Sequence, residues 1–366
     1  MTEQDFLKLL SRYKTGRLSR REEAAFAEAA ASGRFDQLVQ DDVLEALMQP
    51  PAEKRGWMRV VGSWRYRAAA AAVLIGGISA FFAMRALKNN GTDAPSGMPV
   101  AEVLPGSNKA LLTLADGSVM ELDSSGAIVI PTQGDASIRS AGGQLSYDGN
   151  AGSGGATAFN TLRTPRGGQF KVILSDGTKV WMNAESALTY PTTFSGDMRE
   201  VELTGEAFFE VEKDAKKPFR VKASQTTVDV LGTSFNVMAY KDEKEVNATL
   251  VQGAVIVKGN GGAKQLQPGQ QATVTEGSAL QVNEVDVEEV LAWKNGLFIF
   301  QDADLHSVMR QLARWYDVEI EYQGRPSDMK LNGAVYRNYS LSQVLTVLKA
   351  TGLQFRIEAR KLIIIT

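Results

Sequence analysis

The chain has 366 residues, is 44% hydrophobic and carries a formal charge of −2, so it is long enough for two or three domains with cores of their own. The near-neutral charge argues against a direct nucleic-acid partner, which would require a strongly basic surface. The chain lacks cysteine and has one histidine, His306, which excludes disulfides and thiolate chemistry and leaves too few ligands for a histidine metal centre. We therefore expect no cofactor, no metal and no enzyme activity beyond a candidate self-cleavage.

Residues 1–50 are predicted to form a small all-α bundle in the cytoplasm. Apolar residues recur at helical spacing, Ser19 and Glu22 form a capping box, and two prolines follow the last apolar turn. A bundle of this size buries little surface by itself, so its apolar face is expected to complete its core on a partner protein. The alternative is a minimal bundle without a partner. The candidate partner-binding residues are Phe6, Leu9, Leu10, Tyr13 and Phe26.

Residues 68–84 are predicted to form a single transmembrane helix. They are uncharged and lie between Arg67 and Arg85. A helix of this length covers about 26 Å, slightly less than the roughly 30 Å of a hydrocarbon core. The alternative is a buried, alanine-rich helix of a soluble domain. Small residues on faces that can pack closely, Gly76, Gly77 and Ala80, suggest that the span pairs with another helix or is cleaved within the membrane.

The flanks of this stretch predict its orientation. The segment 51–67 is basic, and the positive-inside rule places it in the cytoplasm. Residues 89–366 would then lie in the periplasm, which makes the chain a single-pass protein of the inner membrane with a cytoplasmic N-terminus. A linker, 85–110, is rich in turn-forming residues.

Residues 111–286, with a core at 160–260, are predicted to form an all-β domain of the sandwich, barrel or solenoid-like kind. Short alternating segments such as FKVIL, REVELT, AFFEV and SFNVMAY are separated by glycine-containing turns. A faint repeat places Asp116-Gly117 and Asp176-Gly177 in similar surroundings sixty residues apart. A repeated hairpin turn explains this repeat without a functional role.

Residues 287–366 are predicted to form an α+β domain with the element order βαββαββ. Its first helix is marked by an apolar stripe, and helices on one face of a sheet are the simplest arrangement for this order. The stripe consists of Leu305, Val308, Met309, Leu312 and Trp315.

Few residue patterns point to chemistry. The motif TPRGG at 164–168 lacks the lysine and the following helix of a phosphate-binding loop. Glu206 and Glu210 lie about 13 Å apart on a strand, too far for the roughly 5 to 9.5 Å of a glycosidase pair, so we expect solvated or structural carboxylates. Gly232-Thr233 joins two predicted strands, where strain could let the threonine hydroxyl attack the preceding carbonyl. The alternative is a glycine at a bulge or tight turn.

Several segments resemble the FecR family of transmembrane anti-sigma regulators in its Bacteroidota form. Within 160–259 they are NTLRTPRGG, LSDGTKVWMNAESALTYPTTF, REVELTGEAFFEVEKDAKKPFRV, VDVLGTSFNVMAY and ATLVQGAVIVKG. Residues 297–366, with LARWYDVEIEY, resemble the family's C-terminal domain, which is related to the short N-terminal domain of secretins and TonB-dependent receptors. The N-terminal segment LLSRYKTGRLSRREE is similar to the family's cytoplasmic domain.

The resemblance implies a function in signal transfer. The cytoplasmic helices would bind an extracytoplasmic-function sigma factor, and the signalling domain of a TonB-dependent outer-membrane receptor would contact the periplasmic part. The regulator would thereby control transcription of uptake genes, with membrane proteases as further partners. Self-cleavage reported in some members maps onto Gly232 and Thr233. The competing interpretation is a membrane-anchored, glycan-binding β module without a regulatory role.

Overall fold

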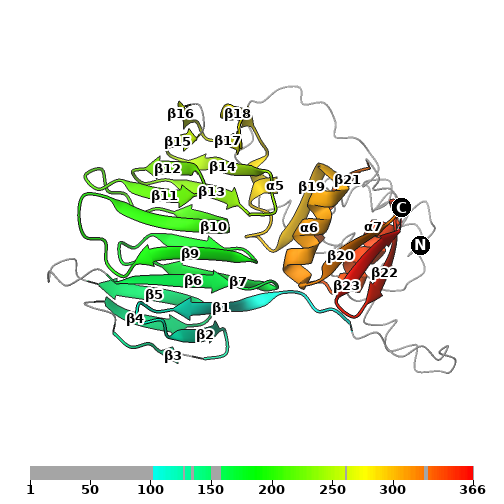
Figure 1. Ribbon diagram of the computed structural model, residues 1–366, viewed down its shortest axis with the longest axis horizontal. Coiled ribbons are helices and arrows are strands. Elements are labelled where there is room, and N and C mark those ends of the chain that lie inside the picture. The colour runs from blue at the N-terminus through cyan, green and yellow to red at the C-terminus, as the bar shows by residue number, and fades with distance from the viewer. Residues whose placement is uncertain are drawn as a thin grey trace, which may run out of the picture. The chain divides into compact units, whose positions relative to one another are not determined.

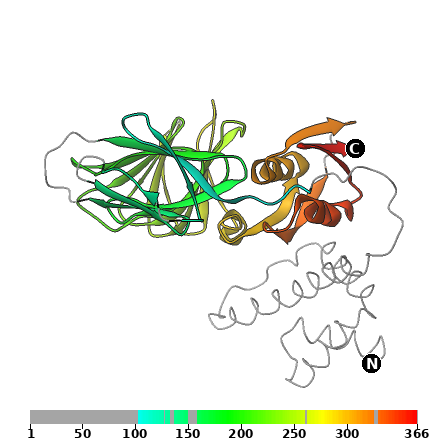
Figure 2. The same ribbon diagram turned by 90° about the horizontal axis from the view of Figure 1, so that it is seen from below.

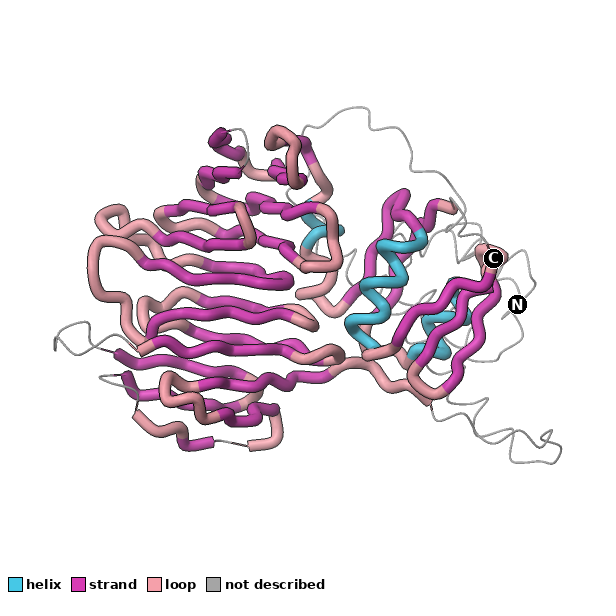
Figure 3. The backbone as a smooth tube through the Cα atoms, in the orientation of Figure 1, coloured by secondary structure: helices cyan, strands magenta, loops and turns pink. Residues whose placement is uncertain are grey.

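The computed structural model describes residues 102–126, 128–132, 136–149, 158–259, 262–324 and 329–365. All of them belong to one compact unit, residues 100–366, and residues 1–99 form the other unit. The described chain is mostly β, with 54% strand and 10% helix. Helices occur only in the C-terminal part of these residues, after a long series of strands (Figure 3).

Residues 107–284 form a β domain of two extended sheets (Figure 1). The first sheet contains, in spatial order, β2 (Val119–Asp123), β1 (Ser107–Thr113), β6 (Phe159–Thr164), β9 (Ser186–Pro191), β10 (Arg199–Glu210), β11 (Phe219–Ala223), β12 (Thr226–Val230), β15 (Val255–Gly259) and β16 (Gly262–Leu266). The second contains β3 (Ile128–Val129), β4 (Ala136–Ala141), β5 (Gln144–Gly149), β7 (Gly168–Ile173), β8 (Lys179–Met182), β10 again, β13 (Ser234–Ala239), β14 (Glu245–Gln252), β17 (Gln270–Thr275) and β18 (Gln281–Glu284).

The core of the β domain lies between these sheets. Alternate residues of each strand point inward, as in β7, where Phe170 and Val172 are buried and their neighbours are half-buried. Inward residues of both sheets belong to one continuous apolar cluster, for example Leu112 of β1 and Val180 of β8. Seen from below, the strands form two layers around this cluster (Figure 2). Burial of alternate residues from both layers is therefore what stabilises the domain.

Strand β10 belongs to both sheets. Its first half pairs with β9 and β11, and its second half pairs with β8 and β13. Gly205 lies between the halves with φ of +91°, a conformation that residues with a Cβ rarely adopt. Strand β1, which pairs with β6, also pairs with β7 in parallel at Ser107 and Asn108. This pairing closes a six-stranded barrel of β1, β6, β9, β10, β8 and β7.

The sequence repeat is confirmed as a repeated turn. In the β1–β2 hairpin the amide of Ser118 donates to the Asp116 carboxylate at 2.9 Å, and in the β7–β8 hairpin the amide of Thr178 donates to Asp176 at 3.0 Å. The glycine of each turn, Gly117 and Gly177, has a positive φ. Both turns need the same Asp-Gly pair for the same local geometry.

The C-terminal domain contains two short sheets and two helices, and a single helical turn precedes it. β19 pairs with β21, and β23 lies between β20 and β22. The elements are α5 (Val287–Val290), β19 (Leu297–Asp304), α6 (Leu305–Tyr316), β20 (Glu319–Gln323), β21 (Lys330–Tyr336), α7 (Leu341–Lys349), β22 (Gln354–Glu358) and β23 (Lys361–Ile365). The apolar stripe of α6 is fully buried in a second core, which α7 and the strands complete.

The predicted fold class is wrong in its all-α N-terminal bundle and its membrane helix. The described chain is mainly β, and no helix within it is long and apolar enough to cross a membrane. The longest helix of this part, α6, has 12 residues. At 1.5 Å per residue it reaches about 18 Å, far short of about 30 Å. The expected bundle at 1–50 and the expected span at 68–84 were inferred from patterns in residues that lie outside the described ranges.

Candidate functional site: the seam between two domains

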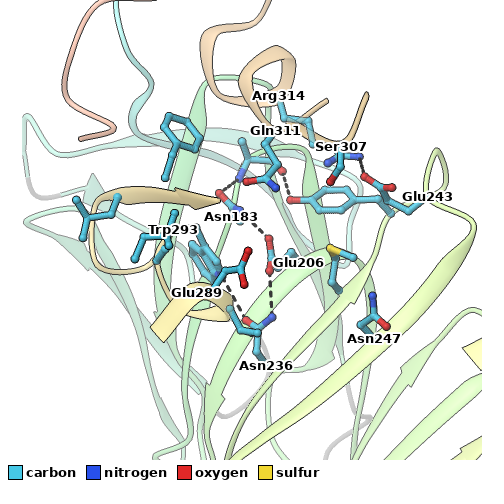
Figure 4. A pocket seen from close by; sticks show the side chains of 18 of the residues that line it. Asn183, Glu206, Asn236, Glu243, Asn247, Glu289, Trp293, Ser307, Gln311 and Arg314 are labelled. Carbon is cyan, nitrogen blue, oxygen red and sulfur yellow. Dashed lines mark hydrogen bonds and ion pairs between the residues drawn. The ribbon is translucent and has the colours of Figure 1, made fainter. Parts of the chain in front are cut away.

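A buried carboxylate, Glu206, lies where the β domain meets the C-terminal domain (Figure 4). It is 8% exposed and belongs to the second half of β10. One of its oxygens accepts a hydrogen bond from Asn183 Nδ2 at 2.8 Å, and the other accepts one from Asn236 Nδ2 at 3.0 Å. Burial raises the pKa of Glu206 above its ordinary value of 4.5, although the two amide donors oppose this shift. Glu206 is therefore a structural carboxylate and is not solvated.

The C-terminal side reaches this carboxylate through Trp293 and Arg337. Trp293 Nε1 donates to Asn236 Oδ1 at 3.3 Å. Arg337 donates to the carbonyl oxygen of Trp293 and to Asn183 Oδ1, both at 2.9 Å. Asn183 and Asn236 each contact Glu206, and each also contacts one residue outside the β domain, Arg337 and Trp293 respectively. The hydrogen-bond network therefore joins the β domain to the C-terminal side.

Arg337 is nearly encased by its neighbours. It is 3% exposed, and its guanidinium lies 3.8 Å from the ring centroid of Trp315. Burial lowers the pKa of Arg337 to about 10, although nearby Tyr240, Glu206 and Tyr316 oppose this shift. The side chain therefore remains charged at neutral pH, and its desolvation is offset by hydrogen bonds and by stacking.

A second group of ionic contacts joins helix α6 to the loop after β13. The guanidinium of Arg314 lies 3.8 Å from the ring centroid of Tyr240 and donates to Asp242 and Glu243, both at 2.7 Å. Arg310, one turn earlier, donates to both oxygens of Glu243 at 2.9 and 2.7 Å. Such two-pronged contacts fix orientation as well as distance.

A third contact explains the TPRGG motif. Arg166 donates to the carbonyl oxygens of Ala313 at 2.9 Å and Val318 at 2.7 Å, at the C-terminal end of α6. The amide of Gly167 donates to the carbonyl oxygen of Arg314 at 2.7 Å. The last carbonyls of a helix lack partners within the helix and carry partial negative charge, so an arginine stabilises them. The motif therefore holds a helix end and is not a phosphate loop.

We call these three groups the seam: Asn183, Glu206, Asn236, Trp293 and Arg337; Tyr240, Asp242, Glu243, Arg310 and Arg314; and Arg166 with Gly167. A cavity of about 280 Å³ lies along it and is lined by Glu206, Glu289 and Trp293 among others. Glu206 already pairs with Asn183 and Asn236, and Asn236 pairs with Trp293. No group of three residues suited to a metal ion occurs among the described residues. The arrangement is thus suited to holding two domains together.

The seam leads to a pH prediction for Glu206. Because its pKa is raised in the folded state, the folded protein retains this proton at pH values where the unfolded chain has lost it. The stabilisation from Glu206 is complete below pH 4.5, the ordinary pKa, and is lost as the pH rises through the folded pKa. The Glu206→Gln variant should therefore gain stability relative to wild type as the pH rises above 4.5. The slope of this difference should be at most about 1.4 kcal/mol per pH unit.

Denaturant titrations of both proteins at several pH values measure this slope. The matched change Glu202→Gln, at an exposed position of the same strand, is the control and should change the free energy of unfolding by less than about 0.5 kcal/mol. Parallel curves for wild type and Glu206→Gln would show that Glu206 does not titrate differently in the folded state.

The predicted cleavage site, Gly232-Thr233, lies between β12 and β13 in a restrained conformation. Gly232 has φ of +154°, and a Cβ there would lie 2.7 Å from the Cα of Lys213. Thr233 is 5% exposed, and its hydroxyl donates to the carbonyl oxygen of Ala254 at 3.0 Å. The positive φ and the close packing against Lys213 account for the glycine, and cleavage stays a prediction. A fragment lost on Thr233→Ala substitution would support cleavage, and a single band from both proteins would contradict it.

The remaining site predictions lie outside the described residues. They are the partner-binding candidates Phe6, Leu9, Leu10, Tyr13 and Phe26 and the membrane-packing candidates Gly76, Gly77 and Ala80. Trp293 and Trp315 are buried, whereas Trp181 is half-buried with Lys171 and Lys294 over its ring.

Comparison with known proteins identifies the family. Residues 160–256 match the profile described as FecR protein, and residues 297–364 match the profile described as FecR, C-terminal. A crystal structure from Parabacteroides distasonis, assigned as that of an anti-sigma factor, is 34% identical to this chain with a TM-score of 0.53, and the match covers 56% of this chain and 97% of that one. The chain belongs to the FecR family.

A second crystal structure of an assigned anti-sigma factor from the same organism is 33% identical, covers 57% of this chain and 99% of that one, and has a TM-score of 0.53. Among curated proteins, sequence comparison found no relative. The two FecR profiles match the β domain and the C-terminal domain, the two parts that the seam joins. Membership makes this FecR protein a regulator in signalling, of the anti-sigma class.

Proposed function

We propose that this FecR-family protein binds an extracytoplasmic-function sigma factor through residues 1–50. Its hold on the sigma factor changes when the signalling domain of a TonB-dependent outer-membrane receptor engages residues 111–366. The observation that carries the proposal is the match of both FecR profiles together with similarity to assigned anti-sigma factors over almost their whole length. The seam supports it, because a receptor that pulls on one domain also acts on the other.

The proposed location is the inner membrane, with residues 1–67 in the cytoplasm and residues 89–366 in the periplasm. The basic flank at 51–67 supports this orientation. An alkaline phosphatase fusion after Lys88 tests it: high activity is expected, and activity confined to a cytoplasmic reporter at the same point would contradict it.

The alternative, a glycan-binding module, finds less support in the described residues. Binding of sugar rings requires exposed aromatic faces, and Phe159, at 57% exposure, is the only largely exposed aromatic side chain of the described part. The family comparison favours regulation over this alternative.

Affinity capture of the full-length chain from its native host tests the proposal. We expect an extracytoplasmic-function sigma factor in the eluate, identified by mass spectrometry. Leu10→Asp, in the predicted apolar face, should lower its recovery at least about tenfold, as loss of a central apolar contact does at protein interfaces. Lys8→Asp, on a neighbouring polar position, should leave recovery unchanged. Equal recovery with Leu10→Asp would refute the predicted surface, and capture without any sigma factor would refute the function.

A further inference from the structure

The residues just before β1, Glu102–Gly106, run across the C-terminal domain, although they precede the β domain in sequence; we call them the strap (Figure 1). The hydroxyl of Ser340 donates to the Glu102 carboxylate at 2.6 Å. The amide of Leu341, the first residue of α7, donates to the carbonyl oxygen of Val103 at 3.0 Å. Val103 also packs against the apolar core of the C-terminal domain. The strap therefore occupies the N-terminal end of α7.

The other end of the strap fits closely against helix α6. A Cβ added at Gly106 would lie 2.7 Å from two ring atoms of Trp315 and 2.9 Å from the carbonyl oxygen of Gly167. The next amide, that of Ser107, donates to this same carbonyl oxygen at 2.9 Å. Gly167 in turn donates to Arg314, so the strap ends where the seam begins.

The contacts of the strap are few enough to be reversible. Leu104, at its centre, is 70% exposed. If Glu102 leaves, Ser340 still has Gln343, whose Oε1 accepts from the Ser340 amide at 2.9 Å and lies 3.2 Å from the Ser340 hydroxyl. Ser340 can thus satisfy its polar groups with or without the strap, whereas the Leu341 amide loses its carbonyl partner when the strap leaves.

The position of the strap in the chain allows it to couple the two domains. The strap follows directly on residues 1–101, and its far end is fixed to the β domain by β1. With its first two residues, Glu102 and Val103, seated on the C-terminal domain, the strap spans the same two domains that the seam joins. Displacement of the C-terminal domain from the seam must stretch or release the strap.

We propose that the strap is a releasable latch: its docking on α7 and closure of the seam stabilise each other, so that moving the C-terminal domain frees the segment leading to residues 1–101. By thermodynamic reciprocity, weakening either contact loosens the other by the same factor. The latch concerns the described part alone and does not depend on which partner residues 1–50 bind.

Hydrogen–deuterium exchange of the full-length protein tests the latch from both ends. Gly106→Ala, which forces the strap off Trp315, and Glu102→Ala, which removes the Ser340 contact, should each speed exchange of the Leu341 amide about tenfold, the effect of one hydrogen bond. Both should also speed exchange of the Gly167 amide in the seam. In the opposite direction, Arg166→Ala should speed exchange of Leu341.

Matched controls separate release from unfolding. Gly126→Ala introduces a Cβ with no atom within 4 Å, and Glu121→Ala changes an exposed residue of β2, so neither should alter exchange at these amides. The amide of Val237 in the core should keep its protection in every variant. The latch is refuted if Gly106→Ala and Glu102→Ala leave Leu341 unchanged. It is also refuted if they speed Leu341 alone while Arg166→Ala has no effect on it, because the strap would then be independent of the seam.

Discussion

Gly205→Ala should lower the free energy of unfolding by more than about 3 kcal/mol, because it combines backbone strain with overpacking. The residue has φ of +91°, and a Cβ there would lie 2.6 Å from the Cα and 2.7 Å from the Cβ of Ser186. Ser186 is in β9, so relief would require two paired strands to move apart. Chemical denaturation followed by circular dichroism measures the loss.

Gly196→Ala is the matched control for this change. Gly196 also has a positive φ, +79°, but a Cβ there would meet no atom within 4 Å, so only the backbone strain is introduced. We expect a loss of about 1 kcal/mol there. Equal losses at the two glycines would show that close packing at the point where β10 changes sheets does not contribute.

Arg337→Ala should cost about 3 kcal/mol of stability, since it leaves two buried acceptors without a donor. These are Asn183 Oδ1 and the carbonyl oxygen of Trp293, and the Trp315 ring loses its stacked guanidinium as well. Because Asn183 also contacts Glu206, the loss should extend into the β domain. Denaturant midpoints of wild type and variant measure it.

Arg356→Ala provides the comparison. Arg356 pairs with Glu358 at 2.9 Å, but the two side chains are 52% and 56% exposed. Removal of such a surface pair should change stability by less than about 0.5 kcal/mol. If Arg337→Ala were as mild as this, the buried network would not be what holds the two domains together.

Individual elements could be predicted from local periodicity. The stripe Leu305, Val308, Met309, Leu312 and Trp315 indicated a helix, and all five residues are buried in α6. Alternation in FKVIL indicated the strand β7. These signals are local, since a helix or strand that covers a core shows its buried face in its own sequence.

Strand β10 shows where local patterns fail. REVELT and AFFEV read as two strands with a glycine between them, but the structure forms one strand of 12 residues. Gly205 bends the strand from one sheet to the other and does not end it. Only the pairing partners decide between a turn and a crossing, and pairing is a property of the whole fold.

The seam could not be predicted from sequence for the same reason. Arg337 contacts Asn183, 154 positions away, and no local pattern connects them. One signal was present: Asn236 stands between Phe235 and Val237, and all three are buried, so an amide within an otherwise apolar strand indicated a hydrogen-bonded partner. The identity of that partner, Glu206, required the fold.

The most direct test of the account is titration of the purified full-length chain with its captured sigma factor, in competition with core RNA polymerase. If this FecR protein is an anti-sigma regulator, it should bind the sigma factor in a saturable complex and reduce the fraction bound to the polymerase, and Leu10→Asp should abolish this competition. A sigma factor that binds the polymerase equally well with and without the chain would contradict the central claim.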